Sequence, residues 1–256
     1  MRVAGLLVGQ TLELLRSSVS AGVSTGELDA IAEDSIRRGG GVPSFKGYSE
    51  PPFPASICAS VNDEVVHGIP GERILVEGDV LSIDCGAIVD GWHGDAAITV
   101  PVGPVAVEVT ELLRVTEESM WRGFAAARLG GKVGDISHAV ESYVRSQGEY
   151  GVVEEFTGHG IGTAMHQPPD VPNFGRPGRG PKLVRGMALA VEPMITMGTR
   201  HCHLLDDEWT VATDDGGWAA HFENTFTLTP EGPWILTALD GGEARLTELG
   251  VPFGGH

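Results

Sequence analysis

The amino-acid sequence predicts an α+β fold in which two similar halves share one sheet. Two helical segments followed by several strand-like runs occur twice along the chain of 256 residues. The helix starts of the two halves also match in pattern, because Gly26-Glu27-Leu28-Asp29 and Gly134-Asp135-Ile136-Ser137 resemble each other at an offset of 108 residues. We therefore expect a single domain over residues 1–256, with halves of about 1–103 and 104–256 and a site where the halves meet.

The first half begins with two predicted helices. Apolar residues at spacings of three and four indicate an amphipathic helix that ends near Gly22, and these are Ala4, Val8, Leu12, Leu15 and Val19. Ser24 followed by Glu27 is typical of a capping box, so a second helix starts there and ends at Gly39-Gly40-Gly41. Strand-like runs follow at 57–61, 80–88 and 92–100.

The second half repeats this order. A long helix is predicted from the apolar spacing between Val109 and Phe124, and another begins near Gly134 and ends by Gly148. Strand-like runs then cover residues 187–197, 209–213, 219–229 and 234–238.

Two aspartates lie on a predicted hairpin of the first half. Asp90-Gly91 is a strong two-residue hairpin turn, and the strand pairing it sets makes Asp84 and Asp95 diagonal neighbours on one face. Their Cβ atoms would then be roughly 7 to 8 Å apart, so one cation could bridge them. The alternative is that each is a solvated strand residue, but Asp84 follows an apolar run in which an unpaired carboxylate is costly.

Three further candidates for metal ligands lie in the second half. Glu192 and Glu223 each interrupt an apolar, strand-like run, and His159 stands between glycines that allow close approach to a shared centre. Four converging carboxylates would repel one another unless cations neutralise them, and two divalent ions would balance the charge. The segment is not a phosphate loop, because the lysine and the Ser or Thr of such a loop are missing. Taken alone, a glycine-rich turn of this kind around His159 is more often structural.

The remaining polar groups carry weaker signals. His67 and His166 are either neutral imidazoles beside a substrate or hydrogen-bonded loop residues. The segment His201-Cys202-His203 lacks a second ligand group at zinc spacing, and no serine or cysteine has the context of a nucleophile. The basic run between Arg176 and Arg185 is interpreted most simply as a solvated loop.

Composition narrows the function classes. There are 17 Lys and Arg against 35 Asp and Glu, which gives a net charge of −18 and argues against stable binding to nucleic acid or to an anionic membrane. No apolar run reaches the roughly 18 residues of a membrane span. Three scattered cysteines are too few for a disulfide framework, so we expect a cytoplasmic protein.

Five segments, taken in chain order, resemble the type I methionine aminopeptidases over nearly the whole chain. They are Val61-Asn62-Asp63-Glu64-Val65-Val66-His67-Gly68-Ile69-Pro70, the Asp84 and Asp95 pair, Gly158-His159-Gly160-Ile161-Gly162, Val191-Glu192-Pro193 and Phe222-Glu223-Asn224-Thr225. The resemblance implies the pita-bread (creatinase/aminopeptidase) fold, with two pseudo-symmetric halves around a curved antiparallel sheet. It also implies a hydrolase that removes the initiator methionine from nascent polypeptides when the second residue is small.

The resemblance further implies a site with two divalent ions, whose identity among Mn, Fe, Co and Zn is not fixed by the ligand types. The ligands by resemblance are Asp84, Asp95, His159, Glu192 and Glu223. A metal-bridged water or hydroxide would attack the scissile carbonyl, with Glu192 as the proton shuttle. The substrate would contact His67 and His166, and the methionine pocket would use Tyr48, Cys58, Met165 and Trp209. Asn224 stands where type I enzymes commonly have a histidine.

Several alternatives stay open. The chain could be another pita-bread enzyme that acts on Xaa-Pro bonds, or a pita-bread protein that only binds partners, although the latter typically loses metal ligands. A third interpretation makes every acid a surface residue. We expect a monomer that meets nascent polypeptide amino termini, and a transient ribosome contact through the basic run Arg176–Arg185 is a hypothesis.

Overall fold

The structure is a computed structural model that describes residues 1–255, and it has the predicted α+β organisation. The helices are α1 (Arg2–Ser18), α2 (Thr25–Arg38), α3 (Val107–Ala126), α4 (Val133–Gln147) and α5 (Glu243–Glu248). The strands are β1 (Val42–Pro43), β2 (Ile57–Val61), β3 (Glu64–Val66), β4 (Val80–Val89), β5 (Trp92–Pro101), β6 (Gly151–Val152), β7 (Gly158–Gly160), β8 (Gln167–Val171), β9 (Ala188–Val191), β10 (Met194–Thr196), β11 (Cys202–Leu204), β12 (Val211–Thr213), β13 (Ala219–His221), β14 (Glu223–Leu228) and β15 (Pro233–Ile235).

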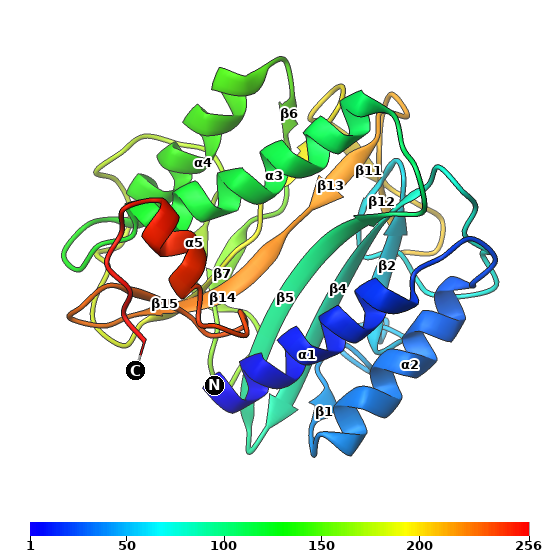
Figure 1. Ribbon diagram of the computed structural model, residues 1–256, viewed down its shortest axis with the longest axis horizontal. Coiled ribbons are helices and arrows are strands. Elements are labelled where there is room, and N and C mark those ends of the chain that lie inside the picture. The colour runs from blue at the N-terminus through cyan, green and yellow to red at the C-terminus, as the bar shows by residue number, and fades with distance from the viewer. Residues whose placement is uncertain (256) are drawn as a thin grey trace.

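One large antiparallel sheet joins the two halves of the chain. Its strand order is β1-β4-β5-β14-β9-β7-β8, with β2 paired to β4 and β15 paired to β14. The join lies between β5 and β14, where Glu223 pairs with Ala97. The long helices lie in front of this curved sheet in Figure 1, where α1 packs on β4 and β5 and α3 packs on β9. The opposite face of the sheet is therefore free to carry a site.

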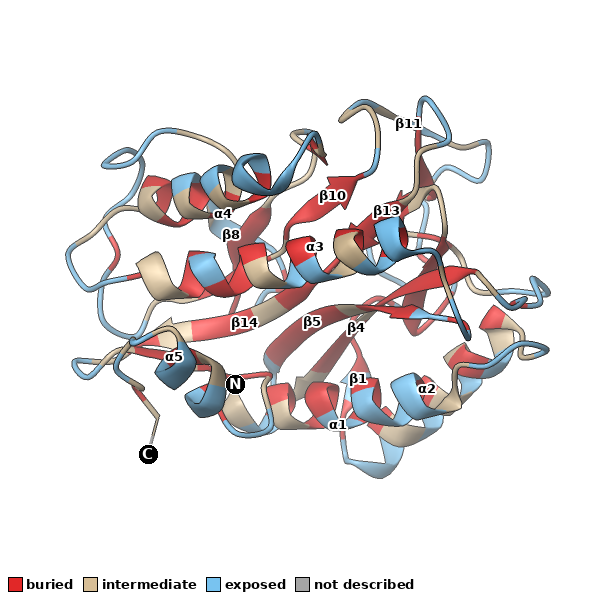
Figure 2. Cartoon of the chain, turned by 45° about the horizontal axis from the view of Figure 1, so that its top comes forward, coloured by how far each residue is buried: buried red, intermediate tan, exposed pale blue. Residues whose placement is uncertain are grey.

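The apolar interior is divided between the two halves. One cluster of buried side chains draws on residues 7–102 and the other on residues 112–246, and Ile98 packs against both. Figure 2 shows the sheet strands as mostly buried and each long helix as buried on one side only. This is the pattern expected when amphipathic helices cover one face of a sheet.

The predicted hairpin and helix start are confirmed. Asp90-Gly91 connects β4 to β5, with Asp84 opposite Ala97 and Gly86 opposite Asp95. The capping box is also present, since the Glu27 amide donates to Ser24 Oγ and the Ser24 amide donates to the Glu27 carboxylate. Local sequence thus determines both features.

Several predicted boundaries were wrong. The predicted strand 219–229 is split into β13 and β14 at Phe222, and the strand predicted to end at residue 238 ends at Ile235. Three other differences have a local reason. The first helix ends at Ser18, because Val19 adopts an extended backbone before the turn at Gly22. The predicted strand 187–197 is split into β9 and β10 at Glu192-Pro193, where Pro193 has no amide hydrogen to donate. The strand expected from Trp209 begins two residues later, since the amides of Trp209 and the next residue donate to the Asp207 carboxylate.

The amino-terminal helix depends on glycine for its close approach to the sheet. A Cβ atom at Gly5 would lie 2.2 Å from the backbone oxygen of Leu236, and one at Gly94 would lie 2.7 Å from the Gly5 nitrogen. Nearby, the Arg2 guanidinium donates to the backbone oxygens of Leu236 and Ala238. The first turn of α1 is therefore held between β5 and the segment that follows β15. Within the described residues, no helix is long and apolar enough to cross a membrane.

The tight contact at Gly5 predicts a reversal of ordinary helix propensity. In an exposed helix, alanine is more favourable than glycine by about 1 kcal/mol. We expect Gly5→Ala to lower the free energy of unfolding by about 1–3 kcal/mol instead, because the new methyl group must displace backbone. The matched control is Gly71→Ala, where a Cβ would have no atom within 4 Å. Urea unfolding of both variants measures the difference, and equal effects would contradict the packing argument.

Candidate metal centre

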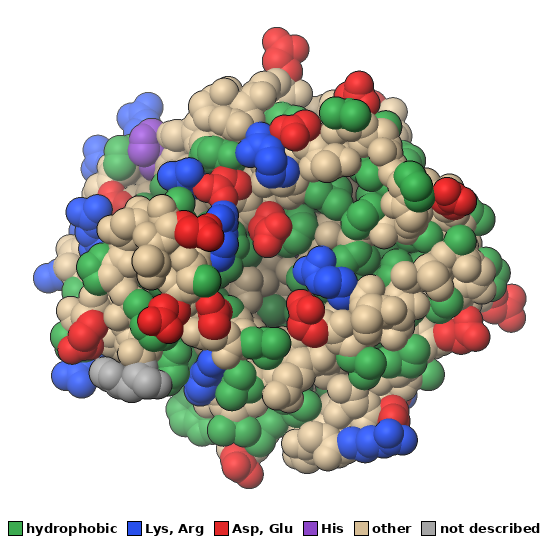
Figure 3. All heavy atoms as spheres, in the orientation of Figure 1, with side chains coloured by type: hydrophobic (Ala, Val, Ile, Leu, Met, Phe, Trp, Pro, Cys, Tyr) green, Lys and Arg blue, Asp and Glu red, His purple; other side chains and the backbone are tan. Residues whose placement is uncertain are grey.

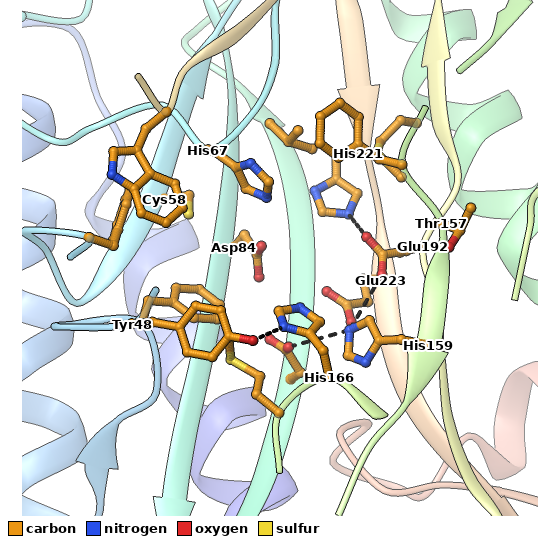
Figure 4. A pocket seen from close by; sticks show the side chains of 18 of the residues that line it. Tyr48, Cys58, His67, Asp84, Thr157, His159, His166, Glu192, His221 and Glu223 are labelled. Atoms are coloured by element: carbon orange, nitrogen blue, oxygen red, sulfur yellow. Dashed lines mark hydrogen bonds and ion pairs between the residues drawn. The ribbon is translucent and has the colours of Figure 1, made fainter. Parts of the chain in front are cut away.

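A cavity of about 290 Å³ opens on the face of the sheet away from the helices. Side chains alternate between the two faces of a strand, and Ile83, Cys85 and Ala96 point into the helix-side core. Their neighbours Asp84 and Asp95 therefore point to the other face, into the cavity. The same alternation applies to β14, whose first residue Glu223 also lines the cavity. Figure 4 shows the side chains of Asp84 and Glu223 pointing into this space from the sheet.

The structure brings together all five residues predicted as metal ligands. Asp84 and Asp95 come from the β4–β5 hairpin, and Glu223 comes from β14 beside it. His159 is the central residue of β7, and Glu192 stands in the break between β9 and β10. The site is therefore built from both halves of the chain.

The distances within this cluster suit cation binding. His159 Nε2 lies 3.5 Å from Glu192 Oε1 and 3.9 Å from Asp95 Oδ2. One ligand atom from each of Asp95, His159 and Glu223 lies within 4.8 Å of the other two. Asp95 and Glu223 are 3% and 2% exposed, so water cannot solvate these carboxylates.

Burial and mutual repulsion perturb every ionisable group of the centre. Burial raises the pKa of Asp84 to about 7. The pKa values of Asp95, Glu192 and Glu223 are also raised, by burial first and then by the neighbouring carboxylates. Burial lowers the pKa of His159 to about 4, so its imidazole is neutral and has a lone pair to donate to a cation. The four buried carboxylates can all stay charged only when cations lie among them.

Buried polar atoms without a hydrogen-bond partner independently test whether divalent cations fit these residues. Within residues 1–255, buried side-chain oxygens of three acids have no hydrogen-bond partner, and they are Asp84 Oδ1, Asp95 Oδ1 and Glu223 Oε1. Buried polar atoms in native proteins nearly always have a partner. All three belong to the carboxylate cluster, so divalent cations with oxygen and imidazole ligands fit the residues that are present.

The predicted substrate residues line the same cavity. Tyr48, Cys58, His67, Met165, His166 and Trp209 all border it. Cys58 and Met165 belong to one small apolar cluster with Phe45 and Phe53, and Trp209 packs against it. The cavity thus has an apolar end next to a carboxylate-rich end.

Two imidazoles connect these ends. Tyr48 Oη lies 2.6 Å from His166 Nδ1, and the ring of His166 contacts the ring of His159 at 4.3 Å between centroids. His67 makes edge-to-face contacts with Phe156 and Trp209. In Figure 4, His166 lies between Tyr48 and His159, and His67, from the loop that follows β3, lies on the other side of Asp84.

Sequence reasoning did not single out His221. This residue is 2% exposed, and its Nε2 lies 3.7 Å from Glu192 Oε2, with no hydrogen-bond partner within the described chain. Its position two residues before Glu223 was the available signal, because alternate strand residues share a face. Phe156 was also not predicted, and its place beside His67 depends on contacts between distant segments.

Two other predicted features lie outside the centre. His203 Nδ1 is paired with Asp214, and within residues 1–255 the His201-Cys202-His203 segment forms no cluster of three ligand groups. Asn224 accepts a hydrogen bond from Thr237 Oγ1 and faces Met120, so its amide lies on the helix side of the sheet.

Comparisons with known proteins agree with this site. Residues 1–230 match the model of metallopeptidase family M24. The chain is 52% identical over 238 residues to a methionine aminopeptidase of Clostridium acetobutylicum, covering 93% of this chain and 94% of that protein. It is 48% identical over 237 residues to methionine aminopeptidase 1 of Bacillus subtilis, again covering 93% and 94%.

Solved structures show the same relationship in three dimensions. The crystal structure of methionine aminopeptidase from Rickettsia prowazekii superposes with a TM-score of 0.90 at 40% identity, covering 93% of this chain and 95% of that chain. An Xaa-Pro dipeptidase from Bacillus anthracis shares the fold, with a TM-score of 0.73 at 23% identity over 59% of its own length. The chain therefore belongs to metallopeptidase family M24 and, within it, to the methionine aminopeptidases, and it has the pita-bread fold that the sequence predicted.

Proposed function

We propose that this enzyme removes the amino-terminal methionine from nascent polypeptides whose second residue is small, with two divalent ions held by Asp84, Asp95, His159, Glu192 and Glu223. The observation that carries the proposal is the cavity itself, in which a cluster of buried, unpartnered carboxylates adjoins an apolar pocket. Mn, Fe, Co and Zn all suit these ligands.

The apolar end of the cavity matches a methionine side chain. Met165, Phe53 and Cys58 are each less than 7% exposed, and the Phe53 ring contacts Trp209 at 5.1 Å between centroids. An unbranched thioether fits such a pocket and contacts aromatic edges favourably. The pocket thereby places the first peptide bond of the substrate beside the carboxylates.

The chemistry divides between the bound ions and the protein. When bound, the ions supply a Lewis acid for the scissile carbonyl and lower the pKa of a water nucleophile. Glu192 stands between two imidazoles, with its carboxylate oxygens 3.5 Å from His159 Nε2 and 3.7 Å from His221 Nε2. From this position Glu192 accepts a proton from the nucleophile and delivers it to the leaving amine.

Tyr48 fixes the tautomer of His166. Burial and the nearby Asp95 raise the pKa of the Tyr48 phenol, so this hydroxyl keeps its proton and donates a hydrogen bond to His166 Nδ1. Burial lowers the pKa of His166, which leaves the imidazole neutral with its own proton on Nε2. His166 then donates a hydrogen bond to the substrate carbonyl, and His67 contacts the substrate peptide.

The same residues support a proposal about organisation. Because the five ligands come from both sides of the β5–β14 join, residues 1–256 would act as one catalytic domain with halves of about 1–103 and 104–256. We propose that it works as a monomer in the cytoplasm, where nascent chains are made, with any ribosome contact being transient.

The first prediction concerns activity and its metal dependence. Protein stripped with a chelator should release methionine from Met-Ala-Ser and Met-Pro-Ala only after Mn, Fe, Co or Zn is added back. Glu192→Gln should reduce kcat by about 10²-fold or more, because the amide cannot move the proton. Glu149→Gln, an exposed change outside the cavity, is the control. Cleavage of Ala-Pro-Ala in place of both methionyl peptides would favour the Xaa-Pro alternative.

The second prediction concerns the stability of the metal-free protein. The folded-state pKa values of the acids are raised, so the folded protein binds more protons than the unfolded chain. The free energy of unfolding therefore falls as the pH rises from about 4 through the folded-state pKa. For Asp84 this folded-state pKa is about 7. Glu223→Gln removes one charge from the cluster. It should raise the free energy of unfolding at pH 8 by on the order of 1 kcal/mol, while lowering the metal bound per chain.

Denaturant unfolding at pH 5 and pH 8 and elemental analysis measure these two effects. The stability gain should shrink at pH 5, and Glu149→Gln should change neither quantity. A Glu223→Gln protein that binds the full metal complement would remove Glu223 from the ligand set.

The third prediction tests the Tyr48–His166 contact. Tyr48→Phe keeps the ring but removes the donor, so we expect kcat to fall about tenfold, the equivalent of one hydrogen bond, with little change in KM. In a His166→Ala background the same substitution should have almost no further effect on kcat. Additive losses in the double variant would show that Tyr48 acts independently of His166.

A further inference from the structure

We propose that an exposed basic surface, formed by residues 128–132 and 176–185, binds the phosphate backbone of a folded RNA. These two segments link α3 to α4 and β8 to β9. None of their residues lines the cavity of the metal centre. The inference therefore concerns a separate surface and does not depend on the proposed reaction.

The Lys and Arg residues of this chain fall into two groups, those whose side chains have an ion pair or hydrogen bond and those whose side chains have neither. Of the 17 Lys and Arg residues, ten form ion pairs with carboxylates, namely Arg16, Arg37, Arg38, Lys46, Arg73, Arg114, Arg122, Arg145, Arg200 and Arg245. Arg2 donates to backbone oxygens. The side chains of the other six have no ion pair or hydrogen bond within the described residues, and they are Arg128, Lys132, Arg176, Arg179, Lys182 and Arg185. All six belong to the basic surface.

Backbone contacts hold the two segments side by side. Lys132 and Lys182 are paired as directly opposite residues of an antiparallel bridge. The Gly134 amide donates to the Arg179 oxygen, and the Gly130 amide donates to the Leu183 oxygen. Figure 3 shows Lys and Arg side chains gathered along the edge of the molecule where α3 ends and α4 begins. Like charges placed opposite each other repel, and a bound anion would relieve that repulsion.

Three acids border this surface, and one of them, Glu231, lines surface hollows together with Arg128 and Arg185. The Asp135 carboxylate accepts hydrogen bonds from the amides of Lys132 and Gly178. The Glu141 carboxylate accepts a hydrogen bond from the Gly175 amide and pairs with Arg145 one turn along α4. Asp135 and Glu141 thus hold the two segments through backbone amides. The charge of Lys132 also contributes to the lowered pKa of Asp135, after the backbone hydrogen bonds, but none of the six basic side chains forms an ion pair or a hydrogen bond within the described residues.

The chemistry of the surface favours phosphates. Four of the six side chains are arginine, whose planar guanidinium binds phosphate oxygens with two parallel hydrogen bonds. Neither segment contains an aromatic residue on which an unpaired base could stack. Leu129 and Val184 are the exposed large apolar residues here, fewer than the apolar centre of a protein interface requires. A folded RNA, recognised by its backbone, fits these features better than single-stranded RNA or an acidic protein.

The net charge of −18 sets the strength of this interaction. The overall field repels a polyanion at long range, whereas contacts between the basic surface and phosphates act at short range. Binding should therefore be weak and steeply salt-dependent, which is what a transient contact requires.

The test is fluorescence anisotropy of a labelled RNA hairpin titrated with full-length protein between 20 and 200 mM KCl. The test variant carries R176Q, R179Q, K182Q and R185Q. The matched control carries R16Q, R37Q, R114Q and R122Q, which removes four cations that are ion-paired on helices and gives the same net charge. A poly-glutamate peptide with the same number of charges serves as a second anion.

We expect the test variant to lose about tenfold or more in affinity for the hairpin at 50 mM KCl, with a smaller slope of log K against log salt. The control should lose less than about threefold, since paired cations offer little to phosphate. Methionine release by the test variant should be unchanged. Equal losses in the two variants, hairpin binding too weak to detect at 20 mM KCl, or equally tight binding of poly-glutamate would overturn the proposal.

Discussion

The electrostatic repulsion among four carboxylates in one cavity is the constraint that the rest of the structure must oppose. Each of these groups is desolvated, and burial raises the pKa of each. Left to itself, such a cluster would separate into solvent. It is held together because Asp84, Asp95 and Glu223 sit on three adjacent antiparallel strands whose opposite face is anchored in the helix-side core. The close contact of α1 with β5 contributes to that anchor, so packing on one face maintains an electrostatically unfavourable arrangement on the other.

Some of this arrangement could be predicted from sequence because it depends on local geometry. The Asp90-Gly91 turn determines the register of the hairpin, and the register places Asp84 and Asp95 on one face. The remaining ligands required more than local pattern. Glu192 and Glu223 were recognisable as acids in apolar runs, but only the resemblance to a family, and then the fold, brought them to the same centre as the hairpin.

What sequence reasoning could not supply are contacts that join distant segments through space. Tyr48 and His166 are 118 residues apart, and no periodicity relates them. His221 approaches Glu192 because β13 pairs with β10. The break at Phe222 had a similar origin, since β13 and β14 belong to different sheets. Long-range pairing of this kind is a property of the whole fold and leaves little trace in any short stretch of residues.

The positions of the Lys and Arg residues show that the negative charge of the chain is unevenly distributed over its surface. Ten of the 17 Lys and Arg residues pair with neighbouring carboxylates, several of them on helix surfaces, for example Arg37 with Glu33 and Arg145 with Glu141. Those pairs are exposed and contribute little to stability individually. The unpaired cations are concentrated at one edge, so the molecule has a strong charge asymmetry despite its large negative total. Because exposed charges interact over about a Debye length, the local sign of that edge decides short-range encounters. The number of phosphate contacts at that edge determines how steeply salt weakens them.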